Sequence, residues 1–318
     1  PKEIDNWIKE AEEVGEVAVD TETSSLDPHQ ADLIGVSLSS KIGKACYIPI
    51  GHKSKKCIKK DIVLKRLKPL LEDPSIKKIG QNIKFDFIVL YKHGINISSM
   101  EDTMLMSYVL DAGKNRHNMD VLSEIHLNHK TITFKDIVGS GKKEINFSEV
   151  DIEKAKDYAA EDADITFRLY KKFNKNLKDE KMVNIYEVFE KPMIKILAFM
   201  EIEGIKVDNK FLETLSSKFE KKIEKIQKEV FKISKKEFNI ASPKQLGEIL
   251  YNDLKIADLK KTKKGSFATS ASVLEDLAFK GHKFPQLVLD WRQVSKLKNT
   301  YSDSLPEHIN QQTKRVHT

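Results

Sequence analysis

The fold of this chain is decided by the stretch VAVDTETSSLD, residues 17–27. It predicts a β-strand that ends in turn-forming residues. Side chains at i and i+2 of a strand point to the same face, so Asp20 and Glu22 project together, about 7 Å apart at the backbone. Two adjacent carboxylates repel each other unless a cation neutralises them. The stretch therefore predicts either a metal-binding pair or a solvated strand edge.

A second candidate acid lies in GQNIKFDFIVL, residues 80–90. This stretch predicts a helix that begins near Asn82. Asn82 and Asp86 are four residues apart and therefore share a helical face. Asp86 has apolar neighbours on both sides, which is an unusual setting for a charged side chain. The alternative interpretation is a surface acid on an amphipathic helix.

A third candidate acid lies in DIEKAKDYAAEDADITFRLYKK, residues 151–172, which predicts the start of a long helix reaching about residue 177. Asp162 falls within the apolar stripe of this helix, and Tyr158 lies one turn earlier on the same side. A buried carboxylate is costly unless a metal or a hydrogen-bond donor compensates it. Glu161 and Asp164 fall on the polar face, so we expect them at the solvated surface.

Together, these stretches supply four acids, two on a strand and two on helices. Carboxylate oxygens are hard ligands that suit Mg²⁺ or Mn²⁺. Four carboxylates are about the complement of a site that holds two ions ~3.5–4 Å apart and stabilises the attacking and leaving oxygens of a phosphodiester. The acids therefore predict a two-metal site.

The 318 residues are enough for about two domains. Strand-like runs come early and then mix with helical periodicity, so we expect one α/β domain over residues 1–178. Residues 179–318 carry almost no strand signal and predict a mostly helical second part. The long helix over about residues 209–236 has apolar residues at spacings of three and four.

The charge, the apolar runs and the cysteines of the sequence limit which classes of protein it can belong to. There are 55 Lys and Arg against 48 Asp and Glu, a net charge of +7 that is compatible either with a polyanionic partner or with a lysine-rich solvated surface. No apolar run approaches the ~20 residues that span a bilayer, so we expect no membrane association. Cys46 and Cys57 form no CxxC motif, which excludes a thiolate zinc site and fits a reducing cytoplasm.

The three acidic stretches resemble a known family. DTETSSLD, GQNIKFD and YAAEDAD are similar to the three exonuclease motifs of the 3′–5′ proofreading domain of family A DNA polymerases, the bacterial DNA polymerase I type. The later stretches MEIEGIKVD, FNIASPKQLGEILY, KKTKKG, WRQVSKLKNTYSDSLPEHIN and TKRVHT resemble the linker and thumb of the same polymerases. The resemblance covers nearly the whole chain, in the same order.

The resemblance implies a ribonuclease H-like exonuclease domain that holds two divalent ions, Mg²⁺ or Mn²⁺. Asp20 would bridge both ions, Glu22 and Asp162 would hold the first, and Asp86 would hold the second through water. It also implies a water-orienting role for Tyr158. Because water and metal would surround the Asp86 carboxylate, we expect Asp86→Ala to leave the fold largely intact.

The resemblance also implies residues that contact the nucleic acid. Asn82 would place the substrate end, and Leu26 and Phe134 would wedge or stack against terminal bases. Phe85 stands near the substrate where the family often has Tyr, so a hydroxyl is missing there. In the thumb, the residues expected to neutralise duplex phosphates are Lys260, Lys261, Lys263, Lys264, Arg292, Lys296 and Lys298. The alternative for these is a solvated basic face.

The expected function is removal of 5′-mononucleotides from the 3′ end of single-stranded DNA, by a monomer that also holds duplex DNA at its thumb. One alternative is a catalytically silent module that only positions primer and template, although all four acids and Tyr158 are present. Another is an RNA-processing 3′–5′ exonuclease, against which the thumb-like half argues. Because no palm or fingers sequence is present, we expect a fragment of a longer polymerase.

Overall fold

The computed structural model describes residues 2–53, 57–256 and 267–317. The chain divides into two compact units, residues 1–203 and 204–318. Within the described ranges, no helix is both long and apolar enough to span a membrane.

The first unit is built on a five-stranded sheet in the order β3-β2-β1-β4-β5. Its strands are β1 (Glu16–Thr23), β2 (Leu33–Lys41), β3 (Lys44–Pro49), β4 (Lys77–Gly80) and β5 (Met100–Asp102). Antiparallel pairing joins β1 to β2 and β2 to β3, whereas β4 pairs in parallel with both β1 and β5. The strand predicted to carry Asp20 and Glu22 is confirmed as β1, and it lies at the centre of the sheet.

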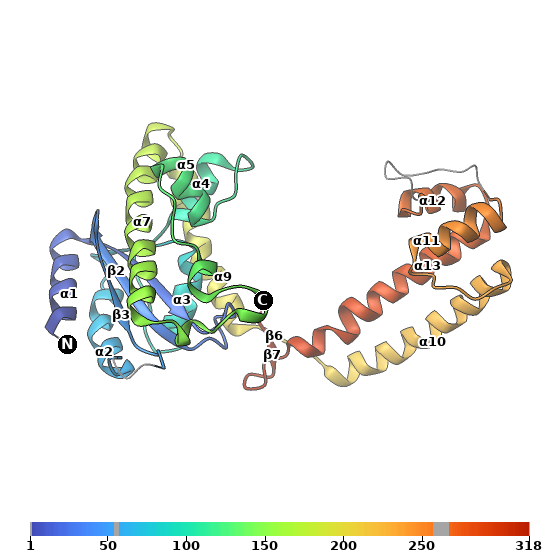
Figure 1. Cartoon of the computed structure of the whole chain (residues 1–318), viewed down its shortest axis with the longest axis horizontal. Coiled ribbons are helices and arrows are strands. Elements are labelled where there is room, and N and C mark those ends of the chain that lie inside the picture. The colour runs from blue at the N-terminus through green and yellow to red at the C-terminus, as the bar shows by residue number, and fades with distance from the viewer. Residues whose placement is uncertain (1, 54–56, 257–266, 318) are drawn as a thin grey trace. The chain divides into compact units, whose positions relative to one another are not determined.

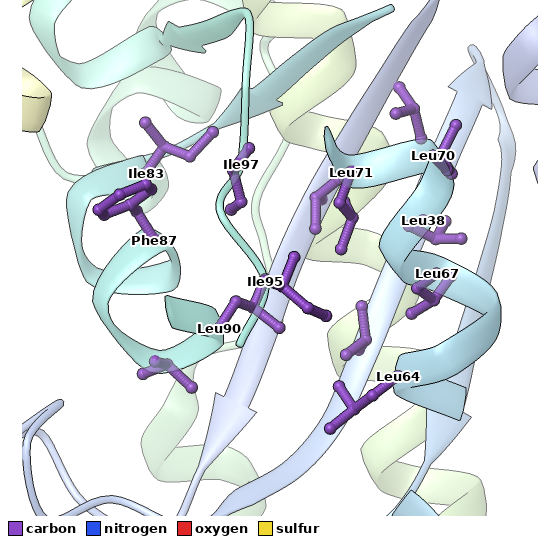
Figure 2. Close-up of a cluster of buried hydrophobic side chains, with 14 of the residues drawn as sticks. Leu38, Leu64, Leu67, Leu70, Leu71, Ile83, Phe87, Leu90, Ile95 and Ile97 are labelled. Carbon is purple, nitrogen blue, oxygen red and sulfur yellow. The ribbon is translucent and has the colours of Figure 1, made fainter. Parts of the chain in front are cut away.

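One face of the sheet is covered by a large apolar core. The helices that contribute to it are α1 (Lys2–Val14), α2 (Lys60–Glu72), α3 (Ile83–Tyr91) and α9 (Lys191–Glu203). Figure 2 shows leucines of α2 and the side chains of Ile83, Phe87 and Leu90 gathered there with Leu38 of β2. Val17 and Val19 of β1 point into this core. The alternate side chains of β1, those of Ala18, Asp20 and Glu22, therefore point to the opposite face.

The opposite face is covered by α4 (Thr103–Asp111), α5 (Met119–Leu127) and α7 (Ile152–Asp179). Figure 1 shows α7 as a long helix that runs beside the strands. Short helices precede it at Phe134–Val138 (α6), Gly141–Lys143 and Phe147–Glu149. The predicted mixed sheet flanked by helices is confirmed, and β5 is a strand that the sequence patterns did not reveal.

The first compact unit includes residues beyond the predicted domain boundary at 178. It ends at Glu203, and the boundary of the exonuclease domain itself stays a prediction. Ile194 and Ala198 of α9 are buried in the same core as α3, and Phe199 packs edge-on against Phe87 at a ring distance of 5.6 Å. A short helix, α8 (Val183–Ile185), and a π-helical segment, Tyr186–Glu190, connect α7 to α9.

The second unit is mostly helical, as predicted. Its α-helices are α10 (Asn209–Ser234), α11 (Pro243–Gly247), α12 (Ala271–Phe279) and α13 (Lys283–Lys296). A π-helical segment, Glu248–Asp253, follows α11. Another, Leu297–Asp303, follows α13 and leads to a 3₁₀ turn, Leu305–His308. Two two-residue strands, β6 (Ile205–Lys206) and β7 (Arg315–Val316), pair in antiparallel fashion. Val230, Leu246, Leu250, Leu274 and Val288 are fully buried in its core.

Candidate active site

Strand β1 carries Asp20 and Glu22 on the sheet face that α7 covers. Ala18 lies two residues before Asp20 and therefore points to the same side. Ala18 is fully buried in the core that includes Ile165 and Leu169 of α7. Both carboxylates consequently project from the end of β1 toward the α7 side.

Helix α7 carries Tyr158 and Asp162 to meet them. Ala159 and Ala163, on either side of Asp162, are fully buried. Their small side chains allow the helix to pack closely where the acids lie. Asp162 is only 5% exposed, as its place in the apolar stripe predicts.

Three carboxylates meet where the strand and the helix converge. Oxygen atoms of Asp20, Glu22 and Asp162 all lie within 4.8 Å of one another. Glu22 is buried, and its Oε1 has no hydrogen-bond partner among the described residues. An uncompensated buried carboxylate oxygen is costly. The three residues thus have the oxygen donor set and the open coordination that a divalent cation requires.

Asp86 is also buried, but it approaches from the other face of β1. Its Oδ1 accepts hydrogen bonds from the Thr21 backbone N–H (2.9 Å) and from the Thr21 hydroxyl (2.5 Å). Thr21 lies between Asp20 and Glu22 in the strand, so Asp86 is tied directly to the segment that carries both acids. The surface-acid alternative for Asp86 is wrong. Asp86→Ala would leave the buried Thr21 N–H without this acceptor, which would lower stability, and the expectation that the fold stays largely intact remains a prediction.

The four acids share a strongly anionic environment. Burial raises the pKa of Asp20 to about 6. Burial first, and the Asp20 charge second, raise the pKa of Glu22, Asp86 and Asp162 well above their ordinary values. Hydrogen bonds from Thr21 oppose this shift at Asp86, and one from Tyr158 opposes it at Asp162. Like charges held this close favour either bound protons or a bound cation.

A cavity of about 900 Å³ adjoins the three-carboxylate cluster. Of the residues expected to act on substrate, those that line it are Asp20, Glu22, Leu26, Phe85, Phe134, Tyr158 and Asp162. Leu26 is 91% exposed and Phe134 is 43% exposed, so both present apolar surface instead of packing in a core. The structure therefore places acids and exposed apolar side chains around one space.

Phe147 also lines this cavity, and the sequence patterns did not reveal it. Its buried ring stacks on Phe134, with centroids 6.2 Å apart and planes 8° apart. It also contacts the Tyr158 ring at 6.1 Å. Phe147 thus packs against both Phe134 and Tyr158. Because it lies in a 3₁₀ turn between helices, no periodicity marks it.

Comparison with known protein families identifies the family of this chain. Residues 1–178, which contain all four acids and Tyr158, match the family model described as 3′–5′ exonuclease. The chain belongs to the 3′–5′ exonuclease family. Residues 209–318 match the model of DNA polymerase family A. Both predicted resemblances are therefore confirmed.

Relatives of this exonuclease-family chain include two bacterial proteins named DNA polymerase I. The one from Rhizobium leguminosarum is 44% identical over 99% of this chain and 33% of its own length. The one from Pseudomonas aeruginosa is 41% identical over 99% of this chain and 35% of its own length. The chain thus spans about a third of the curated relatives it matches.

A solved structure has the same fold. The POL domain of Pol1 from M. smegmatis, in complex with DNA primer-template and dNTP, matches with a TM-score of 0.81 and 25% identity. The match covers 100% of the present exonuclease-family chain and 51% of that chain.

Asn82 lies directly before α3, which confirms the prediction of a helix that begins near it. It is the N-cap of α3, with a left-handed backbone (φ 61°, ψ 47°), and its side chain makes no capping hydrogen bond. It is not among the residues that line the cavity. The role of Asn82 at the substrate end stays a prediction.

The expectation that Glu161 and Asp164 lie at the solvated surface is wrong. Asp164 is 9% exposed, accepts the Gly43 N–H at 2.6 Å and pairs with Arg168 at 2.6 Å. Glu161 pairs with His129 at 2.8 Å and accepts the Ile132 N–H at 2.6 Å. Both acids bind neighbouring segments because α7 is covered on more than one side in this exonuclease fold, which a single apolar stripe does not reveal.

The basic residues of the polymerase-family part divide into three groups. Lys260, Lys261, Lys263 and Lys264 lie outside the described residues. Arg292 is half-buried and donates to the Thr269 carbonyl at 2.8 Å, and Lys298 pairs with Glu220 (2.9 Å) and Asp303 (2.8 Å). Lys296 is exposed. Their phosphate contacts stay predictions.

Proposed function

We propose that this chain hydrolyses the terminal phosphodiester at the 3′ end of single-stranded DNA, as the proofreading part of a DNA polymerase I. The observation that carries the proposal is the convergence of Asp20, Glu22 and Asp162, with an unpartnered Glu22 oxygen, on a cavity that exposed apolar side chains also line. Membership of the 3′–5′ exonuclease family supports the reaction type.

In this proposal, two divalent ions, Mg²⁺ or Mn²⁺, complete the site. Asp20, Glu22 and Asp162 would hold the first, and Asp20 with Asp86 would hold the second. When bound, such ions stabilise the negative charge that develops on the attacking and leaving oxygens of a phosphodiester. The donor set fits because all four residues offer oxygen ligands that need charge compensation.

Tyr158 contributes a hydroxyl that stays protonated. Burial, with the charges of Asp162, Glu22 and Asp20, raises the pKa of Tyr158 well above the ordinary value of a tyrosine. It therefore orients the attacking water through hydrogen bonding and does not act as a base. Leu26 and Phe134 offer apolar surface to the terminal bases, and such contacts tolerate any base. This suits a nuclease that must remove whichever nucleotide is at the end.

The proposal is tested with a 5′-labelled single-stranded DNA oligonucleotide. With Mg²⁺ or Mn²⁺ we expect a descending ladder shortened from the 3′ end, and with chelator no shortening. An RNA oligonucleotide of the same sequence tests the RNA-processing alternative, which predicts that RNA is degraded in preference to DNA. Intact DNA in the presence of either metal would favour the catalytically silent DNA-binding module and reject the proposal.

Divalent ions are expected to raise the melting temperature of the first unit. A carboxyl whose pKa is raised by folding binds its proton more tightly in the folded state, so its ionisation opposes folding. For Asp20, whose pKa rises from 3.8 to about 6, this loss of stability develops between about pH 4 and 6 and is complete above pH 6. At pH 8 and 100 times its Kd, Mn²⁺ should stabilise the folded state by about 2.7 kcal/mol. At pH 5 we expect the same Mn²⁺ concentration to stabilise it less.

The matched variants for this melting experiment are Glu22→Gln, which removes one ligand, and Glu12→Gln, which changes an exposed glutamate of α1. Glu22→Gln should reduce the Mn²⁺-induced shift, and Glu12→Gln should preserve it. A shift that is absent, or equal in both variants, would contradict a cation site at the cluster.

Two lysines of the second unit are expected to differ in DNA binding. Lys296 is exposed, whereas Lys298 is already neutralised by Glu220 and Asp303. Lys296→Ala should reduce the slope of log affinity against log salt by about one unit for duplex DNA. Lys298→Ala should reduce it less. The measurement is a salt titration of duplex binding, and equal reductions would show that the carboxylates release Lys298 to the phosphates.

A further inference from the structure

Asp102 is a fully buried carboxylate outside the acid cluster. It ends β5, where it pairs with Gly80 of β4, and is 1% exposed. Its Oδ1 accepts the backbone N–H groups of Asn82 (3.1 Å), Met104 (2.9 Å) and Leu105 (3.3 Å). Its Oδ2 accepts the N–H of Ile83 at 3.0 Å. One side chain thus satisfies four backbone donors.

These four donors belong to the first turns of two helices. Met104 and Leu105 open α4, for which Asp102 is the ordinary N-cap. Asn82 and Ile83 open α3, whose own N-cap side chain makes no capping bond. A carboxylate at a helix N-terminus satisfies free N–H groups and interacts favourably with the helix dipole. Asp102 therefore caps α3 from a distant strand in place of Asn82.

Helix α3 is the element that carries Asp86. Asp86 lies in the first turn of this nine-residue helix and accepts hydrogen bonds from Thr21 of β1. The N-terminus of α3 is bound by Asp102, and the end of its first turn is bound to β1 through Asp86, so the two contacts together set the position of the Asp86 carboxylate. If the contact between Asp102 and the start of α3 shifted, the first turn of α3 would move, and Asp86 would move with it.

A second set of buried groups holds Asp102 itself. Its backbone N–H donates to the Tyr186 hydroxyl oxygen at 2.9 Å. The Tyr186 hydroxyl donates to Glu101 at 2.9 Å, and Glu101 pairs with Lys191 at 2.7 Å. Tyr186 is 1% exposed and Glu101 is 3% exposed. The strand end that presents Asp102 is therefore fixed by the segment that follows α7.

We propose that Asp102 is a positioning residue of the exonuclease site, which places Asp86 by holding the start of α3. The inference rests on the proposed function. Asp102 touches neither the cavity nor the three-carboxylate cluster, so it acts only through α3. Tyr186 supports the same arrangement one contact further away.

The test uses the whole chain with Asp102→Asn. An amide retains one acceptor oxygen, which can keep the Oδ1 contacts, while its NH₂ faces the Ile83 N–H in place of Oδ2. The cap of α4 is thereby kept and that of α3 is weakened. In the metal-free protein, amide exchange at Ile83 and the following turn should become about tenfold faster. With Mn²⁺ and single-stranded DNA, kcat should fall about 10- to 100-fold, with KM within about twofold.

Asp208→Asn is the matched control. Asp208 caps α10 by accepting the Phe211 N–H at 3.0 Å, and α10 carries none of the proposed nuclease residues. Its kcat should equal that of the parent. Tyr186→Phe keeps the Asp102 carboxylate and serves if Asp102→Asn does not fold; it should show the same faster exchange in α3 and a lower kcat at unchanged KM.

The outcomes separate the two claims. A parent chain that leaves DNA intact in Mn²⁺ rejects the proposed function, and the positioning role with it. If the parent is active, unchanged α3 exchange in Asp102→Asn overturns the inference, because Asp102 then does not hold the helix. Faster exchange with unchanged kcat overturns it too, because the start of α3 would then not place Asp86.

Discussion

Replacing Asp20 with Asn is expected to lower the rate of single-strand degradation by at least about 10³-fold. Asp20 belongs to the three-carboxylate cluster with Glu22 and Asp162, and its charge raises the pKa of both and of Asp86. Loss of a carboxylate that is proposed to bridge both ions would remove stabilisation of charge in the transition state, which is commonly worth several kcal/mol. At about 1.36 kcal/mol per tenfold, this corresponds to three decades or more in rate.

The fold of this variant should be intact. Asn has the shape of Asp, and removing one of several like charges relieves repulsion in the metal-free protein. Its melting temperature without metal should therefore equal or exceed that of the parent. Asp32 is an exposed acid directly before β2. Asp32→Asn is the matched control and should keep parental activity. Degradation by Asp20→Asn within a few-fold of the parent would contradict the two-metal proposal.

Asp86→Asn is expected to cause a similar loss, at least about 10³-fold, with little change in stability. The amide oxygen can still accept the Thr21 N–H and hydroxyl, whereas the negative charge that would hold the second ion is gone. Asp86→Ala should lose the same activity and also stability, by about 1–3 kcal/mol, because the buried Thr21 N–H is left without an acceptor. Rates on single-stranded DNA and denaturant unfolding measure the two effects separately.

Thr21→Val distinguishes a charge role for Asp86 from a purely structural one. This variant removes the hydroxyl bond but keeps the backbone bond and the carboxylate charge. If the charge of Asp86 matters, Thr21→Val should keep most of the activity that Asp86→Asn loses. If both variants lose activity equally, the role of Asp86 is to hold β1 in place, and its assignment to the second ion is wrong.

Much of the site was predictable because each half of it follows a local repeat. The two-residue period of β1 correctly placed Asp20 and Glu22 on one face, and the helical period of α7 correctly placed Tyr158 and Asp162 on another. The bonds of Glu161 and Asp164 to segments beside α7 were missed, because their partners, Gly43 and Ile132, lie far from them in the sequence. The capping of α3 by Asp102 was missed because the donor lies at the start of α3 and the acceptor at the end of β5, 19 residues later in the sequence.

By itself, the sequence determined which side chains share a face of one strand or one helix, and the order of motifs by which the family was identified. These properties depend on backbone geometry over a few residues, so they can be predicted without knowing the rest of the chain. Only the tertiary structure decided which faces meet: Asp162 against Glu22, Asp86 beneath Thr21, and Phe147 behind Phe134. Such contacts depend on how the sheet and helices pack across long stretches of chain, and no local repeat records that packing.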